Sequence, residues 1–123
     1  MRGPASAGVA AMERPVLVYT TYPSLVEAER AGRNLVESGL AACVNILPGM
    51  VSIYRWQGRI ERADEVVMIV KTQPALTGKV AEAVKAGHPN EVPAILFLET
   101  TGGEKSFVDW IFAETAAAAG PRR

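Results

Sequence analysis

The segment that most restricts how this chain can fold is Glu65-Val66-Val67-Met68-Ile69-Val70-Lys71, in which five apolar residues follow one another. Neighbouring residues of a β-strand point to opposite faces of a sheet, so a strand of this kind is apolar on both faces. Such a strand has to be covered on both faces as well. The fold must therefore bury this strand between two layers.

Patterns typical of strands and helices alternate along the rest of the chain. Strand patterns, rich in β-branched and other apolar residues, cover residues 14–22, 40–47, 51–56, 59–72 and 94–100. Helix patterns cover residues 24–38 and 74–87, and a last helix starts near residue 106. We expect a turn or kink at Pro48-Gly49 and a tight hairpin at Gln57-Gly58. Ser24 and Ser106, each followed three residues later by an acidic residue, are expected to cap the first and last helices.

The order of these elements indicates an α+β fold. Strand, helix, strand hairpin, helix, strand and then an extra helix is the order of a ferredoxin-like (split βαβ) sandwich with an extra C-terminal helix. We expect one domain over residues 14–115, preceded by a disordered leader at residues 1–13 and followed by a frayed tail at residues 116–123.

This fold leaves part of the apolar surface without a cover. Two helices cover only one face of a four-stranded sheet, yet the strand at residues 65–71 is apolar on the other face too. Monomers rarely expose large apolar surfaces. Burying about 600 Å² of apolar surface per chain contributes on the order of 15 kcal/mol before the costs of association. We therefore expect an obligate oligomer.

Composition argues against several function classes. Thirteen basic and thirteen acidic residues cancel, so no net field attracts the chain to nucleic acid or to an anionic membrane surface. The N-terminal segment from Met1 to Ala11 is too short and too weakly apolar to form a signal-peptide core or a membrane span. A single cysteine cannot form a disulfide within the chain, which is usual for a protein of the reducing cytoplasm.

Four short segments, in this order along the chain, resemble the successive signatures of a known family. They are Ala41-Ala42-Cys43-Val44-Asn45-Ile46, the stretch Ser52–Glu61, Ile69-Val70-Lys71-Thr72, and His88-Pro89 with Glu91-Val92-Pro93. Together they make the sequence from about Val16 to Ile111 similar to the CutA divalent-cation tolerance proteins. The sequence departs from the family pattern at Asn90, where Tyr is usual, and at Ala94, where Glu is usual.

The resemblance carries expectations about fold and function. It implies a ferredoxin-like subunit in a tight homotrimer, built like the PII signalling proteins, with strands pairing across subunits. It also implies a cytoplasmic protein linked to tolerance of copper and other divalent metals, with copper binding described for the family and no established enzymatic reaction. The two departures remove a ring and a carboxylate from the loop after His88.

Cys43, His88 and Glu91 are the candidate metal ligands. Cys43 and His88 are the chain's only cysteine and histidine, and thiolate and imidazole suit copper, zinc and other transition metals. No cofactor is required by this hypothesis. The alternatives are that Cys43 acts as a small buried apolar residue and that His88 caps the preceding helix. Because the three residues come from different elements, a shared site would need them to converge in space, for instance across a subunit boundary.

Tyr54, Trp56 and Lys71 are the candidates for a ligand cleft. Tyr54 and Trp56 lie two residues apart on one face of a strand beside the hairpin turn. They either line a cleft between subunits together with Lys71 or serve as packing or interface anchors. Lys71 ends an apolar strand and is alternatively a structural lysine paired with Glu61 or Glu91.

Two functions follow from these candidates. The first is a homotrimer involved in tolerance of, or response to, divalent metals such as copper, which binds transition metals weakly. The second is a PII-like signalling or scaffold trimer that holds a small ligand or an unidentified partner protein in clefts between subunits. We expect no enzyme, because no nucleophile with a neighbouring base is evident, and no nucleotide binding, because the chain lacks a glycine-rich phosphate loop.

Overall fold

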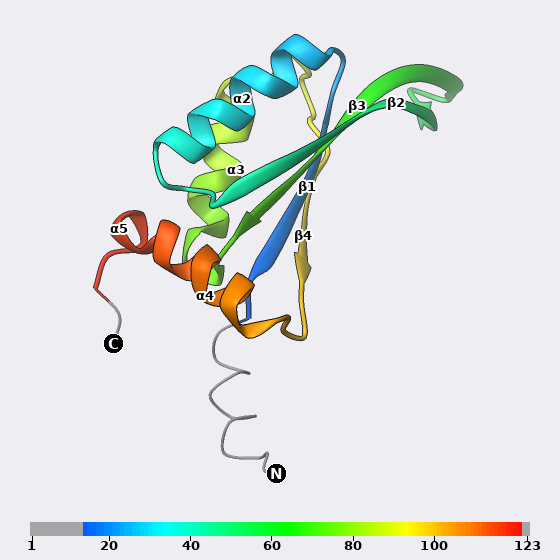
Figure 1. Ribbon diagram of the computed structural model, residues 1–123. Helices are drawn as coiled ribbons and strands as arrows, with labels where there is room; N and C mark the ends of the chain where they lie inside the picture. Colours follow the sequence, from blue (N-terminus) through cyan, green and yellow to red (C-terminus); the bar gives the residue numbers. More distant parts are fainter. Residues whose placement is uncertain (1–13, 122–123) are drawn as a thin grey trace.

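The computed structural model describes residues 14–121, so the leader expected at residues 1–13 lies outside the described residues. The chain alternates strands and helices in the expected order (Figure 1). In chain order the elements are β1 (Val16–Tyr22), α2 (Leu25–Glu37), β2 (Cys43–Trp56), β3 (Arg59–Thr72), the 3₁₀ turn η1 (Pro74–Leu76), α3 (Thr77–Ala86), β4 (Ile95–Glu99), α4 (Lys105–Glu114) and α5 (Ala116–Ala119).

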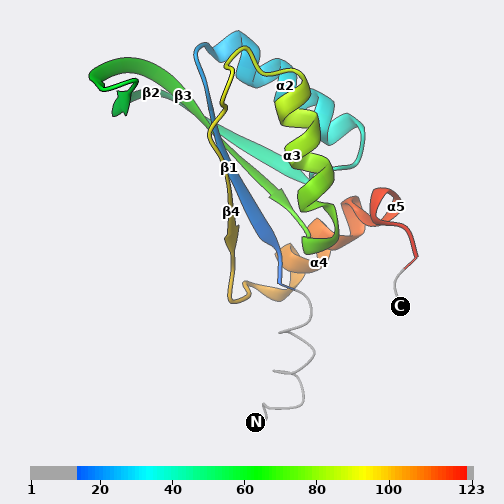
Figure 2. The same ribbon diagram turned by 180° about the vertical axis from the view of Figure 1, so that it is seen from behind.

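The four strands form one antiparallel sheet in the order β2-β3-β1-β4. Strands β1 and β2 run parallel with β3 between them, which defines the split βαβ arrangement. Helices α2 and α3 both lie on one side of the sheet, and α4 lies near one end of the strands (Figures 1 and 2). The prediction of a ferredoxin-like α+β sandwich with an extra C-terminal helix is confirmed.

Ser24 starts α2 as the sequence predicts. Its backbone is extended, and its Oγ accepts a hydrogen bond from the Glu27 amide at 3.3 Å. The same Oγ donates to the Glu27 carboxylate at 2.8 Å. A capping side chain of this kind satisfies one of the amides that have no partner inside the helix.

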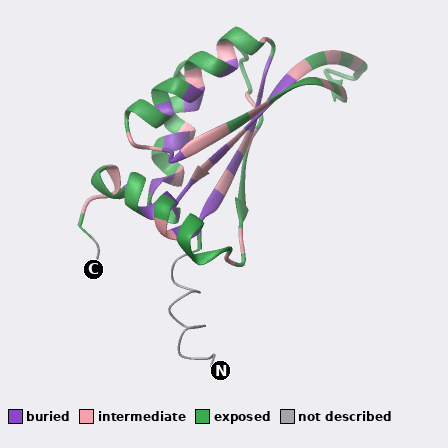
Figure 3. Ribbon diagram, viewed as in Figure 1, coloured by how far each residue is buried: buried purple, intermediate pink, exposed green. Residues whose placement is uncertain are grey.

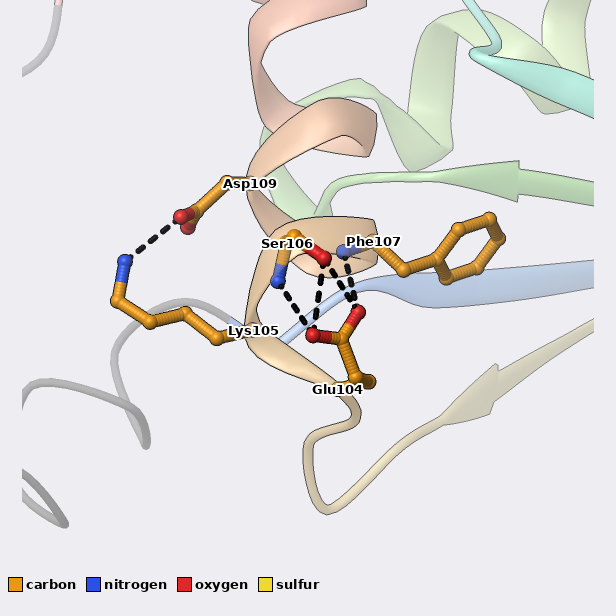
Figure 4. Close-up of polar contacts among 5 residues, drawn as sticks. All are labelled: Glu104, Lys105, Ser106, Phe107 and Asp109. Atoms are coloured by element: carbon orange, nitrogen blue, oxygen red, sulfur yellow. Dashed lines mark hydrogen bonds and ion pairs between the residues drawn. The ribbon is translucent and has the colours of Figure 1, made fainter.

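The cap of α4 differs from the prediction. Glu104, rather than Ser106, is the capping residue, and its carboxylate accepts hydrogen bonds from the amides of Ser106 at 3.1 Å and Phe107 at 2.9 Å (Figure 4). The Ser106 hydroxyl donates to the same carboxylate at 2.7 Å. This hydroxyl bond, together with the two amide bonds, lowers the pKa of Glu104. A carboxylate is favoured at this position because it also complements the positive end of the helix dipole.

Strands β2 and β3 form a long two-stranded arm that projects beyond the body of the domain (Figure 1). Pro48-Gly49 does not end β2, as a turn would, but falls at a register shift between Leu47 and Met50. Gly49 has φ +84°, a conformation that glycine adopts at little cost. The arm ends at Gln57 and Gly58, whose φ values of +52° and +81° suit the tight two-residue turn predicted there.

The core lies between the sheet and the two helices α2 and α3 (Figure 3). Its fully buried members include Val18 and Met68 from the sheet, Leu35 from α2 and Val80 from α3. Gly32 lets α2 approach β2 closely, because a Cβ at this position would stand 2.8 Å from Cγ2 of Val44. The helix-facing side of the sheet is thus packed within a single chain.

The opposite side of the sheet, here called the open face, is apolar and is not covered by α2 or α3. Because side chains alternate between the faces, the open face carries the residues that flank the core positions of each strand. Paired rows across the sheet place Leu17 beside Leu98 and Tyr19 beside Leu96. Leu96 and Leu98 are 63% and 45% exposed. The sequence-based expectation of an apolar face that one chain leaves open therefore matches the structure.

The structure continues past residue 115, where we expected the domain to end. The Gln73 amide donates to Thr115 Oγ1 at 2.8 Å, which ties the end of α4 to the segment before η1. The Lys79 ammonium donates to the carbonyl oxygen of Ala118 at 3.4 Å. The four alanines of α5 thus lie against the domain, within the segment predicted as a tail.

Candidate functional site

A cleft of about 670 Å³ lies between the arm and the loop that joins α3 to β4. Such a volume is within the range of pockets that bind small molecules. Its lining comes from three places: the arm, the open face beside it and the loop. The lining residues are Tyr19, Thr21, Ser52, Ile53, Tyr54, Trp56, Glu65, Pro89, Asn90, Glu91, Val92 and Ala94.

Two aromatic rings form the arm side of this cleft. Tyr54 and Trp56 line the cleft and are each 44% exposed. The Thr21 hydroxyl donates to the Glu65 carboxylate at 3.3 Å on the sheet side, and Glu91 adds a second carboxylate from the loop. Aromatic faces next to carboxylates favour ligands that are planar or positively charged.

His88 holds the loop side of the cleft in place. Its Nε2 lies 2.6 Å from the carbonyl oxygen of Thr21, and its Nδ1 accepts a hydrogen bond from the Asn90 amide at 3.0 Å. Nε2 therefore carries the proton, because a carbonyl oxygen can only accept. The ring also stacks on Tyr22, with centroids 4.4 Å apart. Since both nitrogens are engaged, His88 in this arrangement has no lone pair free for a metal ion.

Cys43 lies at the other end of the sheet. It pairs with Lys71, whereas Thr21, which His88 contacts, pairs with Val67. Four residues of strand separate the two positions, roughly 13 Å at the usual rise. Within residues 14–121, moreover, no group of three or more His, Cys, Asp and Glu side chains is placed to hold a metal ion. One chain alone therefore does not bring Cys43, His88 and Glu91 together, and these donors do not fit a metal centre within it.

Within one chain, Lys71 does not line the cleft that contains Tyr54 and Trp56. Tyr54 pairs with Glu61, and ten residues of β3, roughly 30 Å, separate Glu61 from Lys71. The Lys71 ammonium lies instead over the ring of Phe107 from α4, 5.3 Å from its centroid. A cation over an aromatic face satisfies this lysine without the predicted carboxylate partner.

Sequence reasoning missed several residues of the cleft. Thr21 and Glu65 are polar residues within apolar strands, which was a usable signal, but only the strand register places them beside the arm. Asn90 and Ala94 also line the cleft. They are the two positions at which the loop departs from the CutA pattern, so both departures alter the cleft itself.

The fold and cleft define a class of protein: ferredoxin-like α+β domains with an open sheet face and a projecting hairpin arm. In the part of the chain that the structure describes, no helix has the length and apolar character needed to cross a membrane. A sequence profile described as "CutA1 divalent ion tolerance protein" matches residues 16–114, and the chain belongs to this family.

Individual relatives agree with the profile. A divalent-cation tolerance protein CutA of Thermus thermophilus is 44% identical over 104 residues, covering 85% of this chain and 99% of the relative. A chloroplastic CutA of Arabidopsis thaliana is 35% identical over 96 residues, covering 78% of this chain, which spans 53% of the plant protein. A solved structure named as the periplasmic divalent cation tolerance protein CutA of Archaeoglobus fulgidus has a TM-score of 0.80 at 44% identity, covering 82% of this chain and 98% of that one.

Proposed function

We propose that this protein acts as a homotrimer in the tolerance of divalent metal ions, copper among them, and that it does so in the cytoplasm. Family membership supports the link to divalent ions, since the profile and the Thermus thermophilus relative both carry divalent ion or cation tolerance in their names. The single cysteine supports a reducing compartment. The open face is the observation that carries the assembly.

Three features support association through the open face and the arm. Leu96 and Leu98 of the open face are exposed in one chain, as are Ile53 at 72% and Ile60 at 63% on the arm. Strands β2 and β4 are the two edges of the sheet, so each has backbone groups available to pair with another chain. A second and a third copy would cover the apolar rows and satisfy both edges.

Sedimentation equilibrium tests the assembly directly. We expect a mass three times the 13.1 kDa of the chain, stable on dilution. The double variant with Leu96→Asp and Leu98→Asp should shift the mass towards the monomer, whereas Glu82→Gln at an exposed position of α3 should leave it unchanged. A wild-type monomer at micromolar concentration would refute the proposal.

We further propose that the protein binds transition metals weakly, through donors that different subunits supply near their surfaces. Cys43 is partly exposed and free of disulfide bonds, and Glu91 is exposed. His88 contributes by holding the loop that carries Glu91, because both of its nitrogens already have partners. Single donors brought together from separate chains form a less organised site than a preformed cluster, which is consistent with weak binding.

Calorimetric titration with Cu and Zn ions under reducing conditions tests the metal sites. We expect Cys43→Ser and Glu91→Gln each to lower the affinity by about tenfold, since each removes one ligand. Glu82→Gln, at an exposed position of α3, serves as the control for a lost surface charge. Binding that is unchanged by both substitutions would remove Cys43 and Glu91 from the proposal.

A PII-like role in binding a small ligand or a partner protein is the second candidate, and the cleft favours it. Tyr54 and Trp56 are presented by the arm beside the loop, without a packing partner that would bury them. If the cleft is functional, Trp56→Ala should abolish capture of the ligand while the trimer persists. Loss of the trimer in the same variant would instead assign these rings to the interface.

We propose no catalytic reaction for this protein. Its single histidine is bonded through both ring nitrogens to backbone groups, so it is not free to act as a general base. Hydrolysis of esters or phosphates by the purified protein, lost on Cys43→Ser, would overturn this view.

A further inference from the structure

The loop that joins α3 to β4 is held in place by few contacts. Within the part of the chain that the structure describes, residues 89–93 form one hydrogen bond, from the Asn90 amide to Nδ1 of His88 at 3.0 Å. Four of these five residues are exposed, and Pro93 is partly buried. Segments with few buried contacts open at little cost in free energy. The position of this loop therefore depends strongly on one acceptor atom, Nδ1 of His88.

His88 can accept this hydrogen bond only while its ring is neutral. Nε2 carries the proton and donates to the carbonyl oxygen of Thr21 at 2.6 Å, which leaves the lone pair of Nδ1 for the Asn90 amide. In an imidazolium both ring nitrogens are donors. The proton on Nδ1 would then face the proton of the Asn90 amide, so the bond between them would be lost.

The other contacts of the His88 ring are compatible with a positive charge. The hydrogen bond from Nε2 to the Thr21 carbonyl becomes charge-assisted when the ring is protonated, and such bonds are stronger than neutral ones. The ring also stacks on Tyr22, with centroids 4.4 Å apart, and a cation beside an aromatic face is favourable. Protonation therefore leaves the ring attached to β1 and removes only the bond to the loop.

No neighbouring group is expected to titrate in the same pH range. The charged side chains on the elements around the ring are Glu27 and Arg30 of α2, Lys85 of α3, Glu65 of β3 and Glu91 of the loop. Residues of these types ordinarily keep their charge between pH 5 and pH 8, the range in which histidine ordinarily titrates. Burial, with a smaller contribution from Glu27, raises the pKa of Tyr22 to about 12, so its hydroxyl stays neutral. His88 is also the only histidine of the chain.

We propose that His88 makes the loop between α3 and β4 a pH-sensitive wall of the cleft. While His88 is neutral, Nδ1 holds the Asn90 amide and the loop lies as the structure shows it. When the pH falls and Nδ1 gains a proton, Asn90 is released while the ring stays bonded to Thr21. Glu91, which lines the cleft, then moves with the released loop. This inference is separate from the proposed function, because it requires neither the trimer nor a metal ion.

Nuclear magnetic resonance of the full chain labelled with ¹⁵N tests the proposal between pH 5 and pH 8. The imidazole ¹⁵N shifts report the protonation of each nitrogen of His88, and the amide shifts of Asn90, Glu91 and Val92 report the loop. We expect the ring and these amides to change with one shared midpoint. Hydrogen exchange of the Asn90 amide, corrected for its intrinsic dependence on pH, should become about tenfold faster, because one hydrogen bond is lost.

Two variants assign the transition to His88. His88→Gln keeps a donor that can reach the Thr21 carbonyl but cannot gain a proton in this range, so its loop amides should not depend on pH. Glu91→Gln removes the carboxylate of the loop and should keep the coupled change of ring and amides. If His88→Gln does not fold, the wild-type titration still decides, because it follows the ring and the loop in one sample.

Several results would overturn the proposal. One is a titration of His88 that leaves the amides of Asn90, Glu91 and Val92 unchanged. Another is a ring that stays neutral down to pH 5, or one that leaves Thr21 and Tyr22 when it is protonated. The same pH dependence of the loop amides in His88→Gln would also exclude His88 as the cause.

Discussion

The packing of α2 on β2 depends on Gly32, and replacing this glycine with alanine tests that packing. A Cβ at position 32 would stand 2.8 Å from Cγ2 of Val44 and 3.4 Å from Sδ of Met68. Val44 is β-branched and therefore has few alternative rotamers, and Met68 is fully buried. The new methyl group must push α2 away from the sheet or force Val44 out of its rotamer.

Two opposing effects determine the free energy of unfolding of the Gly32→Ala variant. Alanine in a helix interior is favoured over glycine by about 1 kcal/mol. Overpacking a filled site costs about 1–3 kcal/mol. Because the approach to Val44 is too short to tolerate and its side chain is stiff, we expect the overpacking to exceed the helix gain, with a net loss of about 1 kcal/mol.

A double-mutant cycle makes the test specific. Val44→Ala removes the atom that the new methyl group meets, so Gly32→Ala introduced into that variant should stabilise the protein by about 1 kcal/mol, the helix gain alone. Urea unfolding curves of the four proteins, all recorded at the same protein concentration, measure the two effects. If Gly32→Ala changes the free energy of unfolding in the same direction in the wild type and in Val44→Ala, the contact with Val44 does not limit the packing of α2 and the reasoning fails.

Three further predictions concern ionisable and hydrogen-bonded groups. His88→Ala should lower the free energy of unfolding by about 3 kcal/mol, because it removes two hydrogen bonds and an aromatic stack; urea unfolding checks this, and unchanged stability with lost copper affinity would identify His88 as a ligand instead. The pKa of Tyr22 is raised from 10.0 to about 12, so the free energy of unfolding of the wild type should fall by up to about 3 kcal/mol relative to Tyr22→Phe as the pH rises through this interval. Urea unfolding at pH 9 and pH 12 measures this difference in the free energy of unfolding between wild type and Tyr22→Phe. The same difference at both pH values would contradict the prediction. Glu104→Gln should lower the melting temperature at neutral pH, because the contacts that lower the pKa of Glu104 stabilise only its ionised form. The difference in melting temperature should shrink as the pH falls below the ordinary pKa of 4.5 and through the lowered pKa of the folded state. A difference in thermal melts that does not depend on pH would count against the cap.

Much of the fold was predictable because local signals and tertiary structure agree. The run of apolar and β-branched residues and the turn at Gln57-Gly58 gave both ends of β3 correctly. The start of α2 followed from Ser24 and Glu27. The start of α4 was predicted two residues late, because a glutamate carboxylate can reach the same first-turn amides that a serine hydroxyl does. The continuity of β2 through Pro48-Gly49 was also missed, since a bulge and a turn use similar residues.

The candidate site was less predictable, because it depends on contacts between distant residues. Tyr54 and Trp56 were found from their alternation beside a hairpin, which is local information. The place of Lys71 depends on how far β3 extends, and its partner Phe107 comes from a helix 36 residues further along the chain. The role of His88 depends on the carbonyl of Thr21, 67 residues away, and no sequence pattern records that bond.

The two walls of the cleft differ in stiffness. The loop wall is anchored through His88 to β1, the inner strand of the sheet, so it moves only with the domain. The arm wall lies beyond Val66, where β3 leaves its pairing with β1, and from there to the tip β2 and β3 pair only with each other within one chain. Two-stranded ribbons twist and bend more easily than wider sheets, and the bulge between Leu47 and Met50 lies at the point where this ribbon begins. The width of the cleft therefore depends on how far the arm bends at that bulge, while the loop wall stays in place.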